Sequence, residues 1–405
     1  MISVTQAQRL IAELPYCVHR GPLLKELDSL DSDILAEDIL ADRSYPPFDR
    51  VAMDGVAILY SEFVNGQSDF PVEGCQAAGS PQMSLKQSKS CFEVMTGASL
   101  PKGCDTVIPY EQLTINAGKA TIQSGTDVVL GQNIHGKASD YKKGDLLLKK
   151  GQLIRSPEVS ILASVGKAKV KVAPKPRIAV VSTGDELVPV GAVPLDHQIR
   201  SSNSSTIRNS LREYGFRNCD VFHIDDDASG LFTKLEGILN DYDLIILSGG
   251  VSKGKFDFVP QVLNDLRVDK IFHRIKQKPG KPMWAGKNPE GKVVFALPGN
   301  PVSVMVCLHR YVLPFLQRGC GDELLGIQEA TLTEDIRFAK DMTYFAAVAV
   351  TQVGDQVLAN PVKSNGSGDF SALSRSHGFI ELPQEPADHP KGSTFPLYLW
   401  REGRL

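Results

Sequence analysis

The sequence predicts a multidomain α/β protein built around a doubly wound domain. Compact β-branched apolar runs at residues 177–181, 242–247 and 293–297 are typical of buried parallel strands. Helical patterns with one apolar face lie between these runs, and each run is followed by a polar loop that contains glycine. Because strands alternate with helices in this part of the chain, we expect a sheet with helices on both faces.

The residues before this domain predict a helical layer that a β-rich insertion interrupts. A helix is expected over residues 5–14, stopped by Pro15, and a leucine-rich stretch follows at 23–35. Two adjacent prolines at 46–47 break that pattern. The sequence after them is β-like and punctuated by glycine, with a hairpin expected around the Asn-Ala-Gly turn at 116–118.

After this insertion the chain returns to the helical layer, passes through the α/β domain and ends in β-structure. A helix is expected over residues 156–165, before the α/β domain. Within that domain, a helix over residues 205–214 should end at Gly215, a natural left-handed cap. The last part of the chain alternates like strands again, with a hairpin expected at 354–355, and predicts a small all-β domain.

Composition excludes several classes of protein. The 405 residues carry 44 Lys and Arg against 47 Asp and Glu, a net charge of −3, which offers no broad electrostatic footprint for nucleic acid or an anionic membrane. No apolar run approaches the roughly 20 residues that cross a bilayer, and the first residues lack a signal-peptide pattern. Seven widely spaced cysteines without a CxxC pair fit reduced thiols in a cytoplasmic protein.

The loops after the three predicted strands are the expected ligand site. They are residues 182–186 (STGDE), 248–254 (SGGVSKG) and 298–301 (PGNP). In open α/β sheets, ligands bind beyond the carboxyl ends of the strands, and glycine lets the backbone wrap around an oxyanion. Asn300 fits a helix N-cap and Pro301 the first helical position. One such loop is usually an ordinary turn, but three at equivalent positions predict a site.

Carboxylates and lysines accompany these loops. Asp185 and Glu186 follow the first strand, residues 225–227 are three consecutive aspartates after a probable strand at 219–224, and Asp257 follows the second loop. Hard oxygen ligands beside phosphate-binding loops are what Mg²⁺ prefers. Alternatively, the three aspartates cap the following helix. Lys278 and Lys281, in KPGKP, suit an anion, although lysines in such loops are more often only solvated.

Two shorter motif matches overlap in the second loop. Residues 249–255 satisfy GxxxxGK, but Phe256 stands where a P-loop needs Ser or Thr, so we reject a P-loop. Residues 250–254 satisfy GxSxG, the form of a hydrolase nucleophile elbow, and leave open a serine hydrolase that uses Ser252. That alternative needs an acid and a histidine further along the chain, and none of the later histidines has a distinctive context.

Seven motifs distributed over nearly the whole chain resemble one known family. On these motifs the chain resembles the molybdopterin molybdenumtransferase family of the MoeA type, which the C-terminal part of gephyrin shares. The motifs are PPFDRVAMDGVA (46–57), MTGASLP (95–101), STGDEL (182–187), SGGVSKGKFD (248–257), KPGKP (278–282), LPGNPVS (297–303) and NGSGDFSAL (365–373).

The resemblance implies four subdomains and a reaction. Residues 1–42 and 146–175 would form an extended helical subdomain, 43–145 a β-rich insertion, 176–326 a molybdopterin-binding α/β domain and 327–405 a C-terminal β-barrel. The family inserts molybdenum from molybdate into adenylylated molybdopterin and releases AMP, with Mg²⁺. It also implies a homodimer whose site lies between the α/β domain of one chain and the insertion of the other, and a possible partner in the molybdopterin adenylyltransferase.

Site residues follow from matching the motifs position by position. The resemblance implies that the catalytic residues are Asp54, Asp140, Glu186, Asp226 and Asp257, with Asp226 and Asp257 as metal ligands. From the residues alone, Asp54 would be a turn residue and Asp140 a solvated loop residue. The expected substrate-binding residues are Thr96, Ser182, Thr183, Gly184, Asp185, Gly249, Gly250, Ser252, Lys278, Lys281, Pro298, Asn300, Ser303 and Ser367.

The sequence departs from the family pattern at three places. Arg50 and Val51 replace a usual Asn-Ser pair, and Ala138 and Ser139 replace a Gly-Glu pair before Asp140. Residues 342–347 contain neither of two expected arginines, one of which contributes to anion binding in relatives. Alanine cannot supply a fork of charged donors. A divergent relative that binds molybdopterin without inserting molybdenum is therefore the alternative function.

Overall fold

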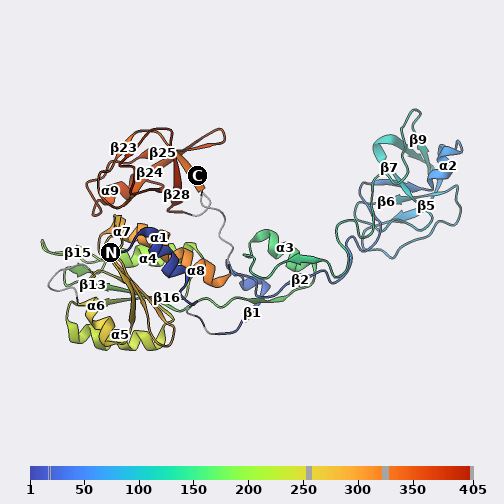
Figure 1. Ribbon diagram of the computed structural model, residues 1–405. Coiled ribbons are helices and arrows are strands. Elements are labelled where there is room, and N and C mark those ends of the chain that lie inside the picture. The colour runs from blue at the N-terminus through green and yellow to red at the C-terminus, as the bar shows by residue number, and fades with distance from the viewer. Residues whose placement is uncertain (17, 19, 252–257, 322–327, 402–405) are drawn as a thin grey trace. The chain divides into compact units, whose positions relative to one another are not determined.

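The structure is a computed structural model, and it describes residues 1–16, 18, 20–251, 258–321 and 328–401. The chain forms two compact units (Figure 1). The first contains Met1–Glu37, Lys150–Pro157 and Lys169–Leu405, and the second contains Asp38–Lys149 and Glu158–Ala168. Among the described residues, no helix is both long and apolar enough to cross a membrane.

The first unit contains the predicted doubly wound sheet. Its strands pair in the order β16-β13-β17-β21-β20-β18, with the first four parallel and the last two antiparallel to their neighbours. The three predicted strands are confirmed, whereas the antiparallel edge was not foreseen. The strands are β16 (Cys219–Ile224), β13 (Ile178–Thr183), β17 (Leu244–Ser248), β21 (Val293–Leu297), β20 (Trp284–Lys287) and β18 (Asp269–His273).

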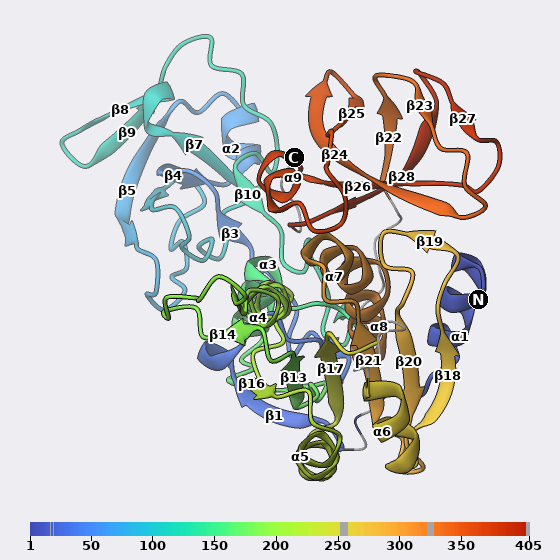
Figure 2. The same ribbon diagram turned by 90° about the vertical axis from the view of Figure 1, so that its left-hand side faces the viewer.

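Helices cover both faces of this sheet because successive strand residues point to opposite sides (Figures 1 and 2). Ile178 and Val180 of β13 pack under one helical layer, and Ala179 and Val181 pack under the other. Each fully buried aliphatic side chain contributes about 1.5–3 kcal/mol relative to exposure. One layer contains α1 (Val4–Ala12), α4 (Asn203–Glu213), α7 (Pro301–Cys307), η3 (Leu308–Val312) and α8 (Leu313–Cys320), and the other contains α5 (Ala228–Asp241) and α6 (Val259–Asp265).

The helix ends follow the expected local signals. Ser3 caps α1 through a reciprocal pair of hydrogen bonds with Gln6. Gly215, just after α4, has the left-handed φ of +77° that its place in the sequence predicted. A π-helical turn, η3, separates α7 from α8, and Pro314 explains it because proline has no N–H to continue the α-helical ladder.

The C-terminal part of the first unit is a closed five-stranded barrel. β24 pairs with both β25 and β26, which closes the ring and removes the sheet edges. The predicted hairpin at residues 354–355 is confirmed, with Gly354 at a φ of +57°. The ring consists of β22 (Gln328–Leu332), β24 (Thr343–Val353), β25 (Gln356–Pro361), β26 (Gly378–Leu382) and β28 (Thr394–Leu399).

Short elements complete the first unit. The two-residue strand β19 joins the barrel beside β24, and the other short strands form three separate pairs, β1 with β12, β14 with β15 and β23 with β27. Their bounds are β1 (Leu23–Glu26), η1 (Leu27–Ser29), β12 (Lys169–Val172), β14 (Leu187–Val188), β15 (Ile199–Arg200), β19 (Gln277–Lys278), β23 (Ile336–Arg337), α9 (Phe370–Arg375) and β27 (Asp388–His389).

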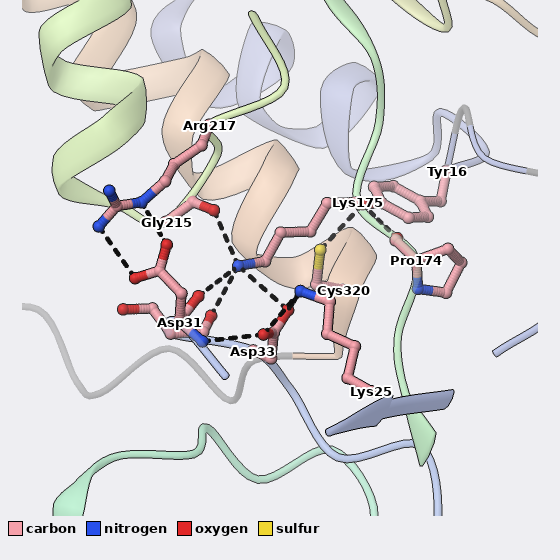
Figure 3. A network of polar contacts seen from close by, with 10 residues as sticks. Tyr16, Lys25, Asp31, Asp33, Pro174, Lys175, Gly215, Arg217 and Cys320 are labelled. Atoms are coloured by element: carbon pink, nitrogen blue, oxygen red, sulfur yellow. Dashed lines mark hydrogen bonds and ion pairs between the residues drawn. The ribbon is translucent and has the colours of Figure 1, made fainter. Parts of the chain in front are cut away.

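The leucine-rich stretch at residues 23–35 therefore forms a strand and a 3₁₀ turn. Its pairing partner, β12, lies far away in the sequence, so no local pattern indicates it. A partly buried lysine, Lys175, holds the end of this stretch in place (Figure 3). Lys175 Nζ donates to the carbonyl oxygens of Asp31 at 3.0 Å and Gly215 at 2.8 Å, and it lies 3.5 Å from the buried Asp33 carboxylate. Burial lowers the pKa of Lys175.

The second unit is β-rich, as predicted for the insertion. Six strands pair in the order β7-β4-β6-β5-β9-β8, and two further pairs join β3 to β10 and β2 to β11. The predicted hairpin is formed by β8 and β9, and the two residues of its turn, Ala117 and Gly118, both have a positive φ. The elements are β2 (Ile39–Leu40), β3 (Arg50–Val51), β4 (Gly55–Ile58), α2 (Tyr60–Val64), β5 (Asp69–Gln76), β6 (Cys91–Val94), β7 (Thr106–Pro109), η2 (Tyr110–Gln112), β8 (Leu113–Asn116), β9 (Lys119–Ile122), β10 (Ile134–His135), β11 (Leu146–Leu148) and, for most of its length, α3 (Ser156–Ser164).

Candidate functional site

A cavity of about 860 Å³ opens at the carboxyl ends of β13, β17 and β21. Its walls include residues 182–184, 248–251 and 298–301, the three loops that the sequence singled out. Residues 198–203 and two residues of the C-terminal part, Gly368 and Phe370, also line it. Ligand pockets in proteins commonly hold about 300–1,000 Å³, so this cavity has room for a nucleotide-sized ligand.

Two positions in these loops, Gly249 and Gly184, require glycine. Gly249 has a φ of +103°, and a methyl group on it would lie 2.7 Å from the carbonyl oxygen of Thr183. A methyl group on Gly184, at a φ of +139°, would lie 2.6 Å from Oε2 of Glu186. A side chain at Gly299 would reach within 3.8 Å of Cα of Gly249. The loops therefore approach one another backbone to backbone, which leaves peptide groups beside the cavity.

Hydrogen bonds between side chains hold the loops together. Asn203 Nδ2 donates to Ser248 Oγ at 3.0 Å and to the carbonyl oxygen of Gly299 at 2.6 Å, so this residue joins the second loop to the third. Asn300 occupies the predicted N-cap position of α7, but its Nδ2 donates to Ser367 Oγ at 2.8 Å. Sequence reasoning missed Asn203, because its partners lie 45 and 96 residues away.

Thr183 presents a buried hydroxyl to the cavity. It is 4% exposed and lines the wall, and its Oγ1 has no hydrogen-bond partner among the described residues. A buried hydroxyl without a partner carries a desolvation cost of about 1–3 kcal/mol. A ligand atom that accepts or donates at this point would remove that cost.

Two of the predicted acidic residues, Glu186 and Asp226, line the cavity. Asp185 supports this wall, since its Oδ1 accepts a hydrogen bond from the backbone N–H of Asp226 at 2.9 Å. The alternative prediction, that the three consecutive aspartates cap the following helix, is confirmed for Asp227. Its carboxylate caps α5 by accepting a hydrogen bond from the N–H of Gly230 at 2.7 Å. Within the described ranges, no group of three or more His, Cys, Asp or Glu side chains gathers as a metal site.

Other predicted substrate residues lie off the cavity wall. Lys278 and Lys281 are exposed, and the wall includes their neighbour Pro282 instead. Ser303 is buried in α7 at 3% exposure. By contrast, Pro298 and Gly250 belong to the cavity wall, and Ser367, which is not part of it, accepts a hydrogen bond from Asn300. Ser252 and Asp257 lie outside the described residues.

Three predicted site residues belong to the second unit, and two of these are in contact. Asp54 Oδ1 accepts hydrogen bonds from the Thr96 backbone N–H at 2.6 Å and from Thr96 Oγ1 at 2.7 Å. These bonds favour the charged carboxylate and lower the pKa of Asp54. The pair thus holds an ionised carboxylate at the surface of this unit.

Asp140 lies at the end of a hydrogen-bonded chain. Its Oδ1 is 2.7 Å from Nε2 of His135, whose Nδ1 is 3.1 Å from a guanidinium nitrogen of Arg50. Because a guanidinium can only donate, Nδ1 accepts, and the neutral ring therefore donates from Nε2 to Asp140. Arg50, which departs from the family pattern, thereby orients His135 toward a predicted site residue. The sequence singled out neither Arg50 nor His135 as a site residue.

The fold and the site define a class of protein. A doubly wound domain with a glycine-lined cavity at its strand ends, joined to a closed barrel and a β-rich unit, is a multidomain ligand-binding α/β protein. The sequence matches family models for the MoeA N-terminal region (domain I and II) over residues 2–166, a probable molybdopterin binding domain over 179–318 and the MoeA C-terminal region (domain IV) over 329–400.

Individual relatives agree with these matches. The chain is 42% identical over 403 residues to a molybdopterin molybdenumtransferase of Synechocystis, covering 99% of this chain and all of that one, and 32% identical to one of Staphylococcus aureus, covering 90% and 88%. The crystal structure of a molybdopterin biosynthesis MoeA protein from Pyrococcus horikosii superposes with a TM-score of 0.80 at 28% identity, covering 99% of each chain. The chain belongs to the molybdopterin molybdenumtransferase family of the MoeA type. The predicted family and fold class are confirmed.

Proposed function

We propose that this chain inserts molybdenum, supplied as molybdate, into adenylylated molybdopterin and releases AMP, as a cytoplasmic homodimer. The observation that carries the proposal is the cavity, most of whose wall lies in residues 179–318, the part that matches the molybdopterin-binding model. Its glycine loops and acidic wall suit a ligand with phosphates and a divalent cation. The names of relatives at 32–42% identity over nearly the whole chain support the same reaction.

The loops would hold the anionic groups of the substrate. Peptide N–H groups around Gly184, Gly250 and Gly299 would offer donors that no bulky side chain covers, whereas the N–H of Gly249 itself donates to the carbonyl oxygen of Leu297 at 3.1 Å. Lys278 and Lys281 would add positive charge from the neighbouring loop. Hydrolysis breaks the phosphoanhydride between AMP and the pterin phosphate, with water adding to phosphorus and AMP leaving. Donors fixed in advance around these oxygens stabilise the charge that develops.

Magnesium fits the donor set at the acidic wall. Asp226 and Glu186 bring carboxylate oxygens to the cavity, and Asp185 holds the backbone of Asp226 in place. Mg²⁺ is usually bound by one or two carboxylates together with waters and phosphate oxygens, so a cluster of three protein ligands is not needed. We propose Asp226 and Asp257 as its ligands. When bound, the ion would neutralise charge on the phosphates.

The homodimer would complete the site with residues of the second unit. Asp54, Thr96 and Asp140 belong to that unit, and the family resemblance pairs them with the cavity of the other chain. The carboxylates of Asp54 and Asp140 would face the molybdate and pterin end of the substrate. The molybdopterin adenylyltransferase that makes the substrate is a possible further partner.

One assay tests the proposal. Purified chain with adenylylated molybdopterin, MgCl₂ and micromolar molybdate should release AMP in step with molybdenum bound to the pterin. Asp226→Asn should lower this rate on the order of 10²-fold. Asp225→Asn, a neighbour that lies off the cavity wall and contacts His223, should leave it unchanged.

The second candidate function predicts a different result. Ala347, in β24 opposite Phe379, leaves residues 342–347 without an arginine for molybdate. A protein that only binds molybdopterin would take up the ligand but show neither AMP release nor molybdenum uptake. That outcome would refute the enzyme proposal and support the binding protein.

A further inference from the structure

One wall residue of the cavity is a largely exposed aromatic side chain. Phe370, the first residue of α9, is 57% exposed and lines the cavity. It is the only aromatic residue among the described residues of the cavity wall, which is otherwise small, polar or aliphatic. No other ring of the described residues packs against it. Single exposed apolar side chains are common on protein surfaces, but this one lines the cavity, where a bound ligand would cover it.

Hydrogen bonds join the segment that carries Phe370 to the third glycine loop and the start of α7. The N–H of Val302 donates to the carbonyl oxygen of Ser367 at 3.1 Å, and Asn300 donates to the Ser367 hydroxyl. These bonds tie residues 366–370 to the start of α7, and α9 lies beside α7 in both views (Figures 1 and 2). The rim and the third glycine loop therefore form one connected structure.

Asp369 stiffens the same segment. Its carboxylate accepts from the N–H of Asn365 at 3.0 Å, from the N–H of Ser371 at 2.9 Å and from the Ser371 hydroxyl at 2.6 Å. These hydrogen bonds lower the pKa of Asp369 to about 2, so the carboxylate stays ionised at neutral pH. A side chain carried by a segment that is held in this way loses little conformational freedom when a ligand packs on it.

We propose that Phe370 is the stacking platform for the flat heteroaromatic ring of the ligand, a purine or a pterin, while the glycine loops hold its phosphates. The inference rests on the proposed function, whose substrate carries both rings. A phenyl ring has no polar atom to offer a phosphate, but its face packs well against any flat heterocycle. Stacking of a base on an aromatic side chain typically changes affinity by about 5- to 100-fold.

Binding measurements with three probes test the proposal. The probes are AMP, ribose 5-phosphate, which lacks the base, and 6-hydroxymethylpterin, which lacks the phosphates. Phe370→Leu should weaken the probe that carries the stacked ring by about 5- to 100-fold and leave ribose 5-phosphate unchanged. A loss for AMP identifies adenine as the stacked ring, and a loss for the pterin identifies the pterin.

Two control variants keep the result specific. Phe370→Tyr retains an aromatic face and should bind as the wild type does. Val353→Ala truncates another exposed apolar side chain of the barrel, at 62% exposure and off the cavity wall, and should change nothing. Unchanged binding of both ring probes by Phe370→Leu would overturn the platform, and so would an equal loss for ribose 5-phosphate.

This experiment separates the platform from the enzyme proposal. If the wild type releases AMP and inserts molybdenum but Phe370→Leu binds both rings normally, only the platform fails. If ring binding depends on Phe370 but the wild type inserts no molybdenum, the platform stands and the enzyme proposal fails.

Discussion

Replacing Gly249 by alanine should destabilise the loop at the floor of the cavity. Gly249 has a φ of +103°, a region that L-residues rarely adopt, and the new methyl group would lie 2.7 Å from the carbonyl oxygen and 2.9 Å from Oγ1 of Thr183. Thr183 ends β13, a strand that is paired on both sides, so its backbone cannot move freely. Such backbone strain costs about 1–3 kcal/mol, and relieving the contact shifts the peptide groups beside the cavity.

The same substitution at Gly237 should stabilise the folded protein instead of destabilising it. Gly237 lies in the middle of α5, is exposed, and has no atom within 4 Å of a new methyl group. Alanine in an exposed helix interior is about 0.5–1 kcal/mol more favourable than glycine. Gly237→Ala is therefore a matched control that carries the same chemical change in the same domain.

Urea unfolding, followed by the fluorescence of Trp284, measures both effects. Trp284 is 1% exposed and packs in the core beneath α5 and α6, and a Trp400→Phe background leaves it as the single tryptophan. The midpoint should fall for Gly249→Ala and rise for Gly237→Ala, and AMP release should fall only for Gly249→Ala. If Gly249→Ala keeps both the wild-type midpoint and AMP release, the loop has neither the strain nor the role assigned to it.

Two further predictions concern buried groups of the first unit. The Arg310 side chain is 7% exposed and lies 2.8 Å from the Glu381 carboxylate. Glu381→Ala removes that carboxylate and should lower the free energy of unfolding, measured with denaturant, by about 3–5 kcal/mol. A second substitution, Arg310→Met, should recover much of the loss. Burial lowers the pKa of His309 below 6.5, so the unfolded chain binds its proton first and stability falls as the pH drops below that value. His309→Asn should flatten this fall in unfolding midpoints measured between pH 5 and 7, and an unchanged slope would contradict the assignment.

Much of the site could be predicted because its signals are local. Asn300 and Pro301 mark the start of α7, Asp227 marks the start of α5, and glycines at 249 and 250 mark a tight bend after β17. Each of these depends on residues only a few positions apart. The predicted floor of the cavity and the acidic wall formed by Glu186 and Asp226 follow from the same short-range patterns.

Other features could not be predicted because they join distant parts of the chain. The bridge of Asn203 to Ser248 and Gly299 requires the sheet order β13-β17-β21 to be known first. The chain from Arg50 through His135 to Asp140 spans 85 residues between its first two members. Neither set of contacts can be predicted from apolar periodicity, because hydrogen bonds between loops leave no repeating pattern in the sequence.

Seven motifs in the amino-acid sequence carried the resemblance to the family, and local patterns alone predicted the strands and helices of the central domain and the loops that end beside the cavity. These depend on apolar periodicity, capping residues and glycine positions, which act over one or two turns of chain. Only the tertiary structure decided that the barrel closes through β24 and β26, that Asn203 bridges two of the loops, and that Phe370 of the barrel lines the cavity. The physical reason is that burial and packing depend on which distant segments meet, and that is set by the whole fold.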